Sequence, residues 1–287
     1  MTGQTLPQDS HHFSTRVGRC LLFVPSLTLG QQNQDWATMR TQSLTGESRV
    51  SSADGTPLWT VAESEVPLTV LLSNGGPGCP DYLAPLAGRD RRIVRWEQRG
   101  VGRSGGEPDG PFTIAQCLTD MEAGRRHYGC DRWVVAGHSW GADLSLMYAL
   151  TRPERCVGIL CVAGGRLNND REWYAEYVRG VAEDREVPLQ TDPPTNMSVN
   201  RQLSAEFKRY VQRPTLLREV ADLQVPALFV YGTEDIQPSW AVAQVAALLP
   251  DAQLHLVPHA DHYLYLTHPE AVRALADVFL TSRQRAM

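Results

Sequence analysis

Short apolar runs recur along the chain, and each is bounded by Gly, Pro or polar residues. They predict β-strands at 66–72, 92–96, 133–137, 157–163, 226–231 and 253–257. The continuous apolar runs 66–72 and 157–163 are typical of strands buried on both faces. Longer segments of helical pattern lie between or after them, at 113–128, 142–151, 239–249 and 269–280. This alternation predicts an α/β fold with a mostly parallel central sheet and helices on both faces.

The alternation begins after a predicted hairpin and is interrupted once. Segments 47–52 and 57–62 flank the turn Ala53-Asp54-Gly55, which is typical of a β-hairpin. Residues 165–223 are more polar and are broken by several prolines, so they predict an inserted helical segment rather than a loop. We therefore expect a core at 46–164 and 224–287, a small helical cap at 165–223 late in the chain, and an N-terminal extension at 1–45.

The N-terminal extension bears a weak likeness to an export signal. Arg16 and Arg19 precede the apolar stretch 21–27, but this stretch is short, contains Pro25 and lacks a small-residue cleavage site. We therefore interpret it as an extension, and Met39 as an alternative start to Met1. No apolar run approaches the roughly 20 residues of a transmembrane helix.

Composition narrows the class of protein. The 287 residues are 42% hydrophobic and 21% charged, which is typical of a globular chain with a sizeable core. The net charge of −5 argues against nucleic acid or an anionic membrane as a partner. The cysteines form no CxxC pair and no zinc-site spacing, so we expect reduced thiols, a cytoplasmic location and neither metal nor cofactor; they are Cys20, Cys79, Cys117, Cys130, Cys156 and Cys161.

The segment 137–141 reads Gly-His-Ser-Trp-Gly and fits the G-x-S-x-G nucleophile elbow. In that elbow a strained turn between a strand and a helix exposes the serine. The pattern alone is weak, but this copy follows a predicted strand and opens a predicted helix. Ser139 is therefore the predicted nucleophile of a serine hydrolase with the α/β-hydrolase fold.

A nucleophilic serine needs a base and an acid that orients the base, and in this fold they follow in the order Ser, Asp or Glu, His. Asp235 lies just beyond the strand 226–231, and His262 lies beyond the strand 253–257. We predict that these two residues complete the triad. The alternatives are Glu234 for the acid, and His259 or His268 for the base.

The negative charge of a tetrahedral intermediate needs fixed hydrogen-bond donors. The residue after the nucleophile, Trp140, is predicted to supply one backbone N–H. The second is expected from the glycine loop at 74–78, at Gly76. A phosphate-binding role for this loop is disfavoured, because no Lys-Ser/Thr follows it and Pro77 lacks an N–H donor.

Three motifs in order resemble the proline iminopeptidase family of α/β-hydrolases. That family carries His-Gly-Gly-Pro-Gly, Asp-Gln-Arg-Gly-x-Gly-x-Ser and a Gly-x-Ser-x-Gly elbow. Here the segments are Asn-Gly-Gly-Pro-Gly at 74–78, Glu-Gln-Arg-Gly-Val-Gly-Arg-Ser at 97–104 and the elbow with Trp140. The segment 261–270 also resembles the region of that family's catalytic histidine. The resemblance extends over roughly residues 46–283.

The resemblance has departures. Asn74 and Glu97 replace the family's histidine and aspartate at positions that support loop geometry, and the inserted segment is shorter than the family's cap. In that family acidic cap residues hold the free amino terminus of the substrate. The resemblance assigns this role to Glu172, Glu176 or Glu206, with a solvated helix face as the alternative reading.

Aromatic residues of the predicted cap suggest one wall of a substrate pocket. They are Trp173, Tyr174 and Tyr177, and the alternative is that they pack the cap against the core. We expect a metal-independent hydrolase that acts on a small ester, amide or short peptide, as an iminopeptidase-like aminopeptidase, through an acyl-serine. A carboxylesterase, a thioesterase, an acyltransferase or a non-catalytic binding protein on this scaffold are the alternatives. The exact substrate and the oligomeric state stay open.

Overall fold

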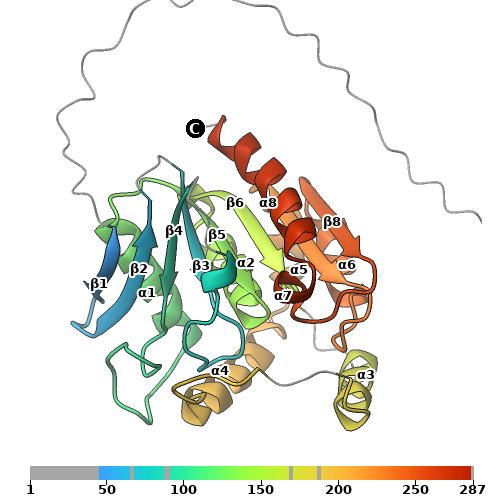
Figure 1. Cartoon of the computed structure of the whole chain (residues 1–287), viewed down its shortest axis with the longest axis horizontal. Helices are drawn as coiled ribbons and strands as arrows, with labels where there is room; N and C mark the ends of the chain where they lie inside the picture. The colour runs from blue at the N-terminus through green and yellow to red at the C-terminus, as the bar shows by residue number, and fades with distance from the viewer. Residues whose placement is uncertain (1–44, 65–67, 87–90, 168–170, 186–188, 286–287) are drawn as a thin grey trace, which may run out of the picture. The chain divides into compact units, whose positions relative to one another are not determined.

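One sheet of eight strands forms the centre of the described structure (Figure 1). The strands are β1 (Gly46–Ser51), β2 (Pro57–Glu63), β3 (Thr69–Ser73), β4 (Arg92–Trp96), β5 (Trp133–His138), β6 (Cys156–Val162), β7 (Ala227–Gly232) and β8 (Ala252–Val257). Their order is β1-β2-β4-β3-β5-β6-β7-β8. β1 and β2 pair antiparallel, β2 pairs antiparallel with β4, and all later neighbours are parallel. The predicted hairpin and the mostly parallel sheet are confirmed.

The computed structural model describes residues 45–64, 68–86, 91–167, 171–185 and 189–285. The predicted N-terminal extension therefore lies outside the described residues, apart from its last position. No helix in the described part combines the length and apolar character that a membrane crossing requires.

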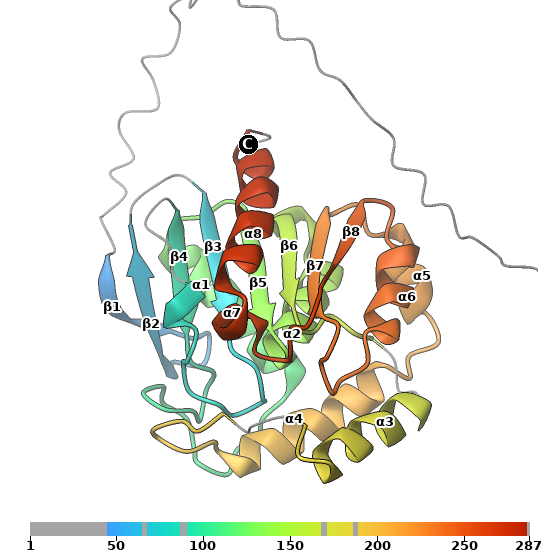
Figure 2. The same ribbon diagram turned by 45° about the vertical axis from the view of Figure 1, so that its right-hand side comes forward.

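Helices cover both faces of the sheet (Figure 2). They are α1 (Ile114–His127), α2 (Trp140–Thr151), α6 (Trp240–Leu248), α7 (Leu264–Thr267) and α8 (Pro269–Gln284), with short 3₁₀ helices η1 (Ala84–Leu86) and η2 (Pro153–Arg155). Side chains alternate along each strand: Leu71 belongs to the core cluster with α1, α2 and α6, whereas Val70 and Leu72 belong to the cluster with α8. Burial on both faces explains why β3 and β6 read as continuous apolar runs, whereas the edge strand β8 is mostly exposed or half-buried.

The predicted helix at 113–128 begins at a capping box. The side chain of Thr113 accepts a hydrogen bond from the backbone N–H of Gln116, and the side chain of Gln116 bonds back to the backbone N–H of Thr113. Two unpaired donors at the first turn are thereby satisfied. The helix start that the sequence predicts at Thr113 is confirmed.

The predicted insertion between β6 and β7 is helical. It contains α3 (Arg171–Ala182), α4 (Met197–Tyr210) and α5 (Leu216–Asp222). Figures 1 and 2 both place α3 and α4 beyond the same end of the sheet, and side chains from both line a cleft with Ser139. α5 instead contacts α6 of the core. The cap over the site therefore consists of α3 and α4.

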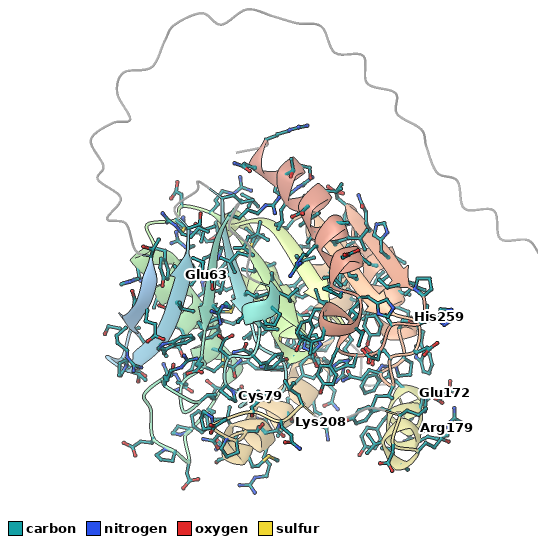
Figure 3. All side chains as sticks on the ribbon, in the orientation of Figure 1. Glu63, Cys79, Glu172, Arg179, Lys208 and His259 are labelled. Atoms are coloured by element: carbon teal, nitrogen blue, oxygen red, sulfur yellow. The ribbon has the colours of Figure 1, made fainter. Side chains whose placement is uncertain are left out.

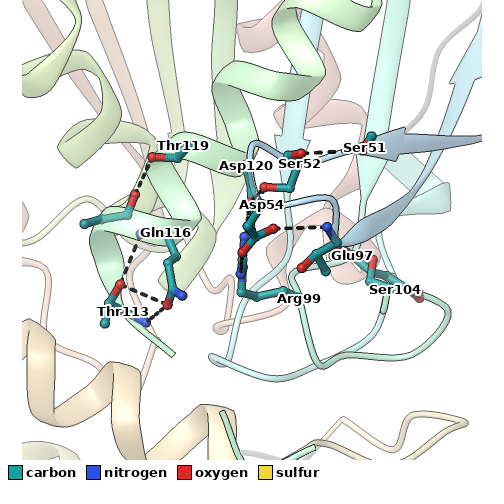
Figure 4. Close-up of polar contacts among 12 residues, drawn as sticks. Ser51, Ser52, Asp54, Glu97, Arg99, Ser104, Thr113, Gln116, Thr119 and Asp120 are labelled. Carbon is teal, nitrogen blue, oxygen red and sulfur yellow. Dashed lines mark hydrogen bonds and ion pairs between the residues drawn. The ribbon is translucent and has the colours of Figure 1, made fainter. Parts of the chain in front are cut away.

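The turn after β4 is held by ion pairs, of which the one between Arg99 and Asp120 is buried (Figure 4). The guanidinium of Arg99 donates to both carboxylate oxygens of Asp120 on α1, at 2.8 and 2.7 Å, and to Asp54 at 2.6 Å. The carboxylate of Glu97 accepts from the backbone N–H groups of Asp81 and Arg103, at 3.1 and 2.5 Å. Glu97 thus supports this loop, as the sequence predicts for that position.

Candidate active site

Ser139 occupies a strained turn between β5 and α2. Its backbone has φ 53° and ψ −121°, a conformation that costs free energy in a non-glycine residue. A Cβ on Gly137 would lie 2.2 Å from the carbonyl carbon of Gly141, and one on Gly141 would lie 2.0 Å from the carbonyl oxygen of Ser73. Only glycine fits at both positions, so the turn has the geometry that the pentapeptide predicts.

Asp235 and His262 meet from two different loops. Asp235 follows β7, His262 follows β8, and Oδ2 of Asp235 lies 2.8 Å from Nδ1 of His262. The backbone N–H of Gln237 donates to the other carboxylate oxygen of Asp235 at 2.7 Å. Both side chains are nearly inaccessible, at 5% exposed for His262 and 0% for Asp235. A carboxylate against Nδ1 holds the proton there and leaves Nε2 as the basic atom.

The side chain of Gln237 contacts that basic atom. Its Nε2 lies 3.3 Å from Nε2 of His262, where an amide N–H can donate to an unprotonated ring nitrogen. Gln237 also lines the cleft that contains Ser139. The Gln237 side chain therefore links His262 to the cleft.

The alternative acid and base pair with each other at the surface. Nδ1 of His259 lies 2.8 Å from Glu234, and their side chains are 85% and 60% exposed. Figure 3 shows His259 at the edge of the molecule. His268 precedes α8 and bonds to Thr267.

A cleft of about 370 Å³ contains Ser139 at its wall. Gly76 and Trp140, the predicted oxyanion donors, line it as well. Trp140 is the first residue of α2, so its N–H has no partner within the helix and lies at the positive end of the helix dipole. Gly76 has φ +49°. The structure thus brings the predicted nucleophile and both predicted donors to one cleft.

The cap contributes aromatic residues to the cleft but not the glutamates assigned by resemblance. Trp173, Tyr174 and Tyr177 line it, whereas Glu172 and Glu176 do not. Glu176 instead pairs with Arg179 and Arg185.

Glu206 is also directed elsewhere. It accepts a hydrogen bond from the backbone N–H of Ile114 at 2.6 Å and is not among the cleft residues.

Trp173 has a packing role as well, because its indole N–H donates to the carbonyl of Pro238 at 3.0 Å and its ring stacks on Tyr177.

Three charged cleft residues were not predicted from the sequence: Asp143, Arg166 and Lys208. The sequence feature that points to Asp143 is its spacing from Ser139, because a residue four positions after Ser139 faces the same side of α2. Arg166 follows β6 at the sheet edge that carries the site, where parallel strands present ligand-binding residues. Lys208 shares a helical stripe of cleft residues with Asn200 and Ser204 on α4, and Val211, the residue that caps α4, continues it.

Burial raises the pKa of Asp143 to about 6, although Arg166 and two backbone N–H groups oppose the shift. Its Oδ1 accepts from the N–H groups of Gly165 and Arg166 at 2.8 and 3.0 Å. Oδ2 lies 4.0 Å from Nε of Arg166. The carboxylate therefore holds the start of the inserted segment against α2.

A buried hydrogen-bond chain joins three loops around the site. The N–H of Gly75 donates to the hydroxyl of Tyr82 at 2.7 Å, and this hydroxyl lies 2.7 Å from Nδ1 of His138. Nε2 of His138 lies 2.8 Å from the carbonyl oxygen of His262. Since a carbonyl only accepts, Nε2 of His138 carries the proton.

The same hydrogen-bond chain fixes the role of Nδ1, the other ring nitrogen of His138. Burial, with His262 nearby, holds the pKa of His138 well below its usual value, so the ring is neutral and Nδ1 accepts from Tyr82. The glycine loop, the elbow and the loop of His262 are thus tied together. Within the described residues, no group of three or more His, Cys, Asp or Glu side chains is arranged to hold a metal ion.

Comparisons with known proteins agree with this fold. A family model for the alpha/beta hydrolase fold matches residues 69–191. A probable proline iminopeptidase of Leptolyngbya boryana is 38% identical over 97 residues, which cover 32% of this chain and 30% of the relative. The proline iminopeptidase of Neisseria gonorrhoeae is 34% identical over 143 residues, which cover 40% and 44%. The chain thus matches less than half the length of these curated relatives.

Structural similarity extends further along the chain. The crystal structure of proline iminopeptidase from Mycobacterium smegmatis superposes with a TM-score of 0.64 at 22% sequence identity. The superposition covers 84% of this chain and 99% of that chain. At this identity the likeness concerns the fold.

Proposed function

We propose that this chain, which has the α/β-hydrolase fold, is a serine hydrolase that cleaves a small ester, amide or short peptide through an acyl-Ser139 intermediate. The observation that carries the proposal is the pairing of Asp235 with His262 at 2.8 Å, next to a cleft whose wall contains Ser139 in a strained elbow. A serine on such a turn, a histidine with a basic Nε2 and a buried carboxylate are the groups that acyl transfer requires.

The first half of the reaction forms the acyl-enzyme. Nε2 of His262 accepts the proton of the Ser139 hydroxyl as its oxygen attacks the substrate carbonyl carbon, and the carbonyl π electrons move onto oxygen. The N–H groups of Trp140 and Gly76 stabilise this oxyanion. As the intermediate collapses, the bond to the leaving group breaks and His262 returns its proton to that group. Asp235 stabilises the imidazolium throughout.

The second half releases the acid. His262 accepts a proton from water, the hydroxide oxygen attacks the acyl carbon, and the ester bond to Ser139 breaks. The proton passes from His262 to Oγ of Ser139, which restores the free enzyme. No step requires a cofactor.

The similarity to proline iminopeptidases supports a substrate with an exposed N-terminal residue. This similarity covers less than half of each curated relative, and the cap glutamates assigned to amine recognition are not among the residues that line the cleft. Esters and amides without a free amine therefore stay within the proposal. A cytoplasmic location is also proposed, supported by the free thiols of Cys79, Cys117, Cys130, Cys156 and Cys161.

Labelling with a fluorophosphonate tests the proposed nucleophile. We expect stoichiometric labelling of the wild-type protein, measured by intact mass, and none in Ser139→Ala. Ser282→Ala, which changes a serine on α8 outside the cleft, is the matched control and should label fully. Absence of labelling in the wild type, or labelling retained in Ser139→Ala, would contradict the proposal.

Turnover then separates the substrate classes. Proline and alanine para-nitroanilides are compared with para-nitrophenyl esters of short acids. Hydrolysis of the anilides supports an aminopeptidase, whereas activity confined to the esters removes that reading.

A further inference from the structure

The charges that line the cleft are mainly positive. Among the described residues, the charged side chains at its wall are Arg166, Lys208 and Asp143. Asp143 is buried and already accepts two backbone hydrogen bonds, with Arg166 as its cationic neighbour. A bound ligand therefore meets one more cation than anion.

Arg166 is held in place by aromatic rings of the cap. Its guanidinium carbon lies 3.9 Å from the ring centroid of Trp173 and 5.4 Å from that of Phe207. Stacking covers the face of the planar guanidinium, so its N–H groups, which lie along the edge, can donate to a ligand. The side chain is 23% exposed, so the cleft can reach it.

Lys208 supplies the second cation. It lies on α4, next to Phe207 and one turn after Ser204, and all three line the cleft. In the described ranges no carboxylate lies within the 4.0 Å ion-pair distance of its ammonium group. Its charge is therefore available to a ligand.

The carboxylates of the cap are committed elsewhere. Glu176 pairs with Arg179 and Arg185, and Glu206 with Arg209 and the start of α1. Figure 3 shows Lys208 on α4 and Glu172 on α3, and Glu172 is not among the cleft residues. A protonated amine in the cleft would face two cations and a carboxylate whose Oδ1 is already occupied.

We infer that the substrate is a small ester or amide that carries a carboxylate group, which binds to Lys208 and Arg166 while its apolar part contacts Trp173 and Tyr177. This inference rests on the proposed serine hydrolase function and names its substrate class. A carboxylate matches the fork of an arginine and accepts charge-assisted hydrogen bonds from both cations. The cleft volume of about 370 Å³ suits a small molecule rather than a folded partner.

The first test compares hydrolysis of three matched esters. These are mono-para-nitrophenyl glutarate, para-nitrophenyl hexanoate and the para-nitrophenyl ester of trimethylammoniobutyrate, which are similar in length and differ in charge. We expect the glutarate ester to have the highest kcat/KM, about tenfold above the neutral ester, as two charge-assisted contacts imply. An equal or higher value for the neutral or cationic ester would overturn the inference.

The second test assigns the preference to Lys208. Lys208→Gln should lower kcat/KM for the glutarate ester about five- to tenfold and lower the value for the neutral ester by a clearly smaller factor. Arg209→Gln is the matched control, because it removes a neighbouring cation that is 67% exposed and is not a cleft residue. An equal loss on both esters in Lys208→Gln, or the same selective loss in Arg209→Gln, would refute the assignment.

A binding experiment keeps this inference separate from the proposed catalysis. Isothermal titration of Ser139→Ala with phenylacetate, phenylacetamide and phenethylamine measures anion recognition without turnover. We expect phenylacetate to bind at least about fivefold more tightly than the other two, and Lys208→Gln to abolish that difference. If the amide or the amine binds as tightly, the inference is wrong, even in a protein that labels at Ser139. If the preference holds in a protein that does not label, only the hydrolase function fails.

Discussion

At the scale of single residues, Asp143 shows how a buried charge is retained beside the site. Its side chain is almost fully buried, and burial raises its pKa to about 6. The carboxylate connects α2 to the backbone at Gly165 and Arg166. Between about pH 4 and pH 6, Asp143 is therefore protonated in the folded protein, whereas the same side chain is ionised in the unfolded chain.

Asp143→Asn should make stability less dependent on pH. A raised pKa means that this group's contribution is present at low pH and is lost as the pH rises through that window. Asparagine keeps both backbone contacts without the charge, so at pH 8 the variant should be more stable than the wild type by up to about 3 kcal/mol. The difference should vanish towards pH 4 in urea unfolding experiments. Asp277→Asn, at a side chain that is 60% exposed, should show little change, and a pH-independent difference for Asp143→Asn would contradict this account.

At the scale of elements, the elbow joins β5 to α2 with no spare volume. Gly141 is the second residue of α2 and lies against the end of β3, where a Cβ would contact the carbonyl oxygens of Ser73 and Asn74 at 2.0 and 2.7 Å. These atoms belong to backbone and cannot rotate away. The close approach of the helix to β3 holds Ser139 at the sheet edge.

Gly141→Ala should therefore destabilise the protein by about 3 kcal/mol and lower fluorophosphonate labelling of Ser139. Gly124→Ala is the matched control, because a Cβ on this glycine of α1 would meet only Trp133, at 3.7 Å. It should be neutral or stabilising by up to about 1 kcal/mol. Denaturant unfolding measures both, and equal stability of the two variants would argue against a tight elbow.

At the scale of the whole molecule, three loops that are distant in sequence meet through Tyr82 and His138. The chain from Gly75 through these side chains reaches the carbonyl of His262. It spans the glycine loop, the elbow and the histidine loop. Because the oxyanion donors and the base lie on these separate loops, their mutual position depends on this buried connection.

Tyr82→Phe should reduce kcat about tenfold, with little change in KM, because misplaced catalytic groups act mainly on the chemical step. Tyr128→Phe is the control: its hydroxyl lies 2.6 Å from Thr60, away from the cleft residues. That variant should lose stability but keep kcat. Steady-state kinetics on a para-nitrophenyl ester measures both, and an unchanged kcat in Tyr82→Phe would show that the loops are positioned without this connection.

Much of the fold and part of the candidate site follow from local patterns in the sequence. The apolar runs 66–72 and 157–163 predict β3 and β6 because strands covered on both faces have no polar alternation. β8 lies at the edge of the sheet and exposes Gln253 and His255. Gly137 and Gly141 predict the elbow because only glycine tolerates the contacts of that turn. The order Ser139, Asp235, His262 follows from which loops leave the carboxyl ends of successive parallel strands.

Tertiary structure alone decided which neighbouring side chains turn inward. Asp235 meets His262, whereas the adjacent Glu234 pairs with His259 at the surface. Loop position in the sequence favours the first pair but leaves the second open. Tertiary structure also decided the lining of the cleft, which contains Arg166 and Lys208 but not Glu172 or Glu176. Side-chain direction there depends on how α3 and α4 pack over a sheet formed by segments far away in sequence. The elbow is thus determined locally, whereas the charge that a substrate meets is determined by the assembled fold.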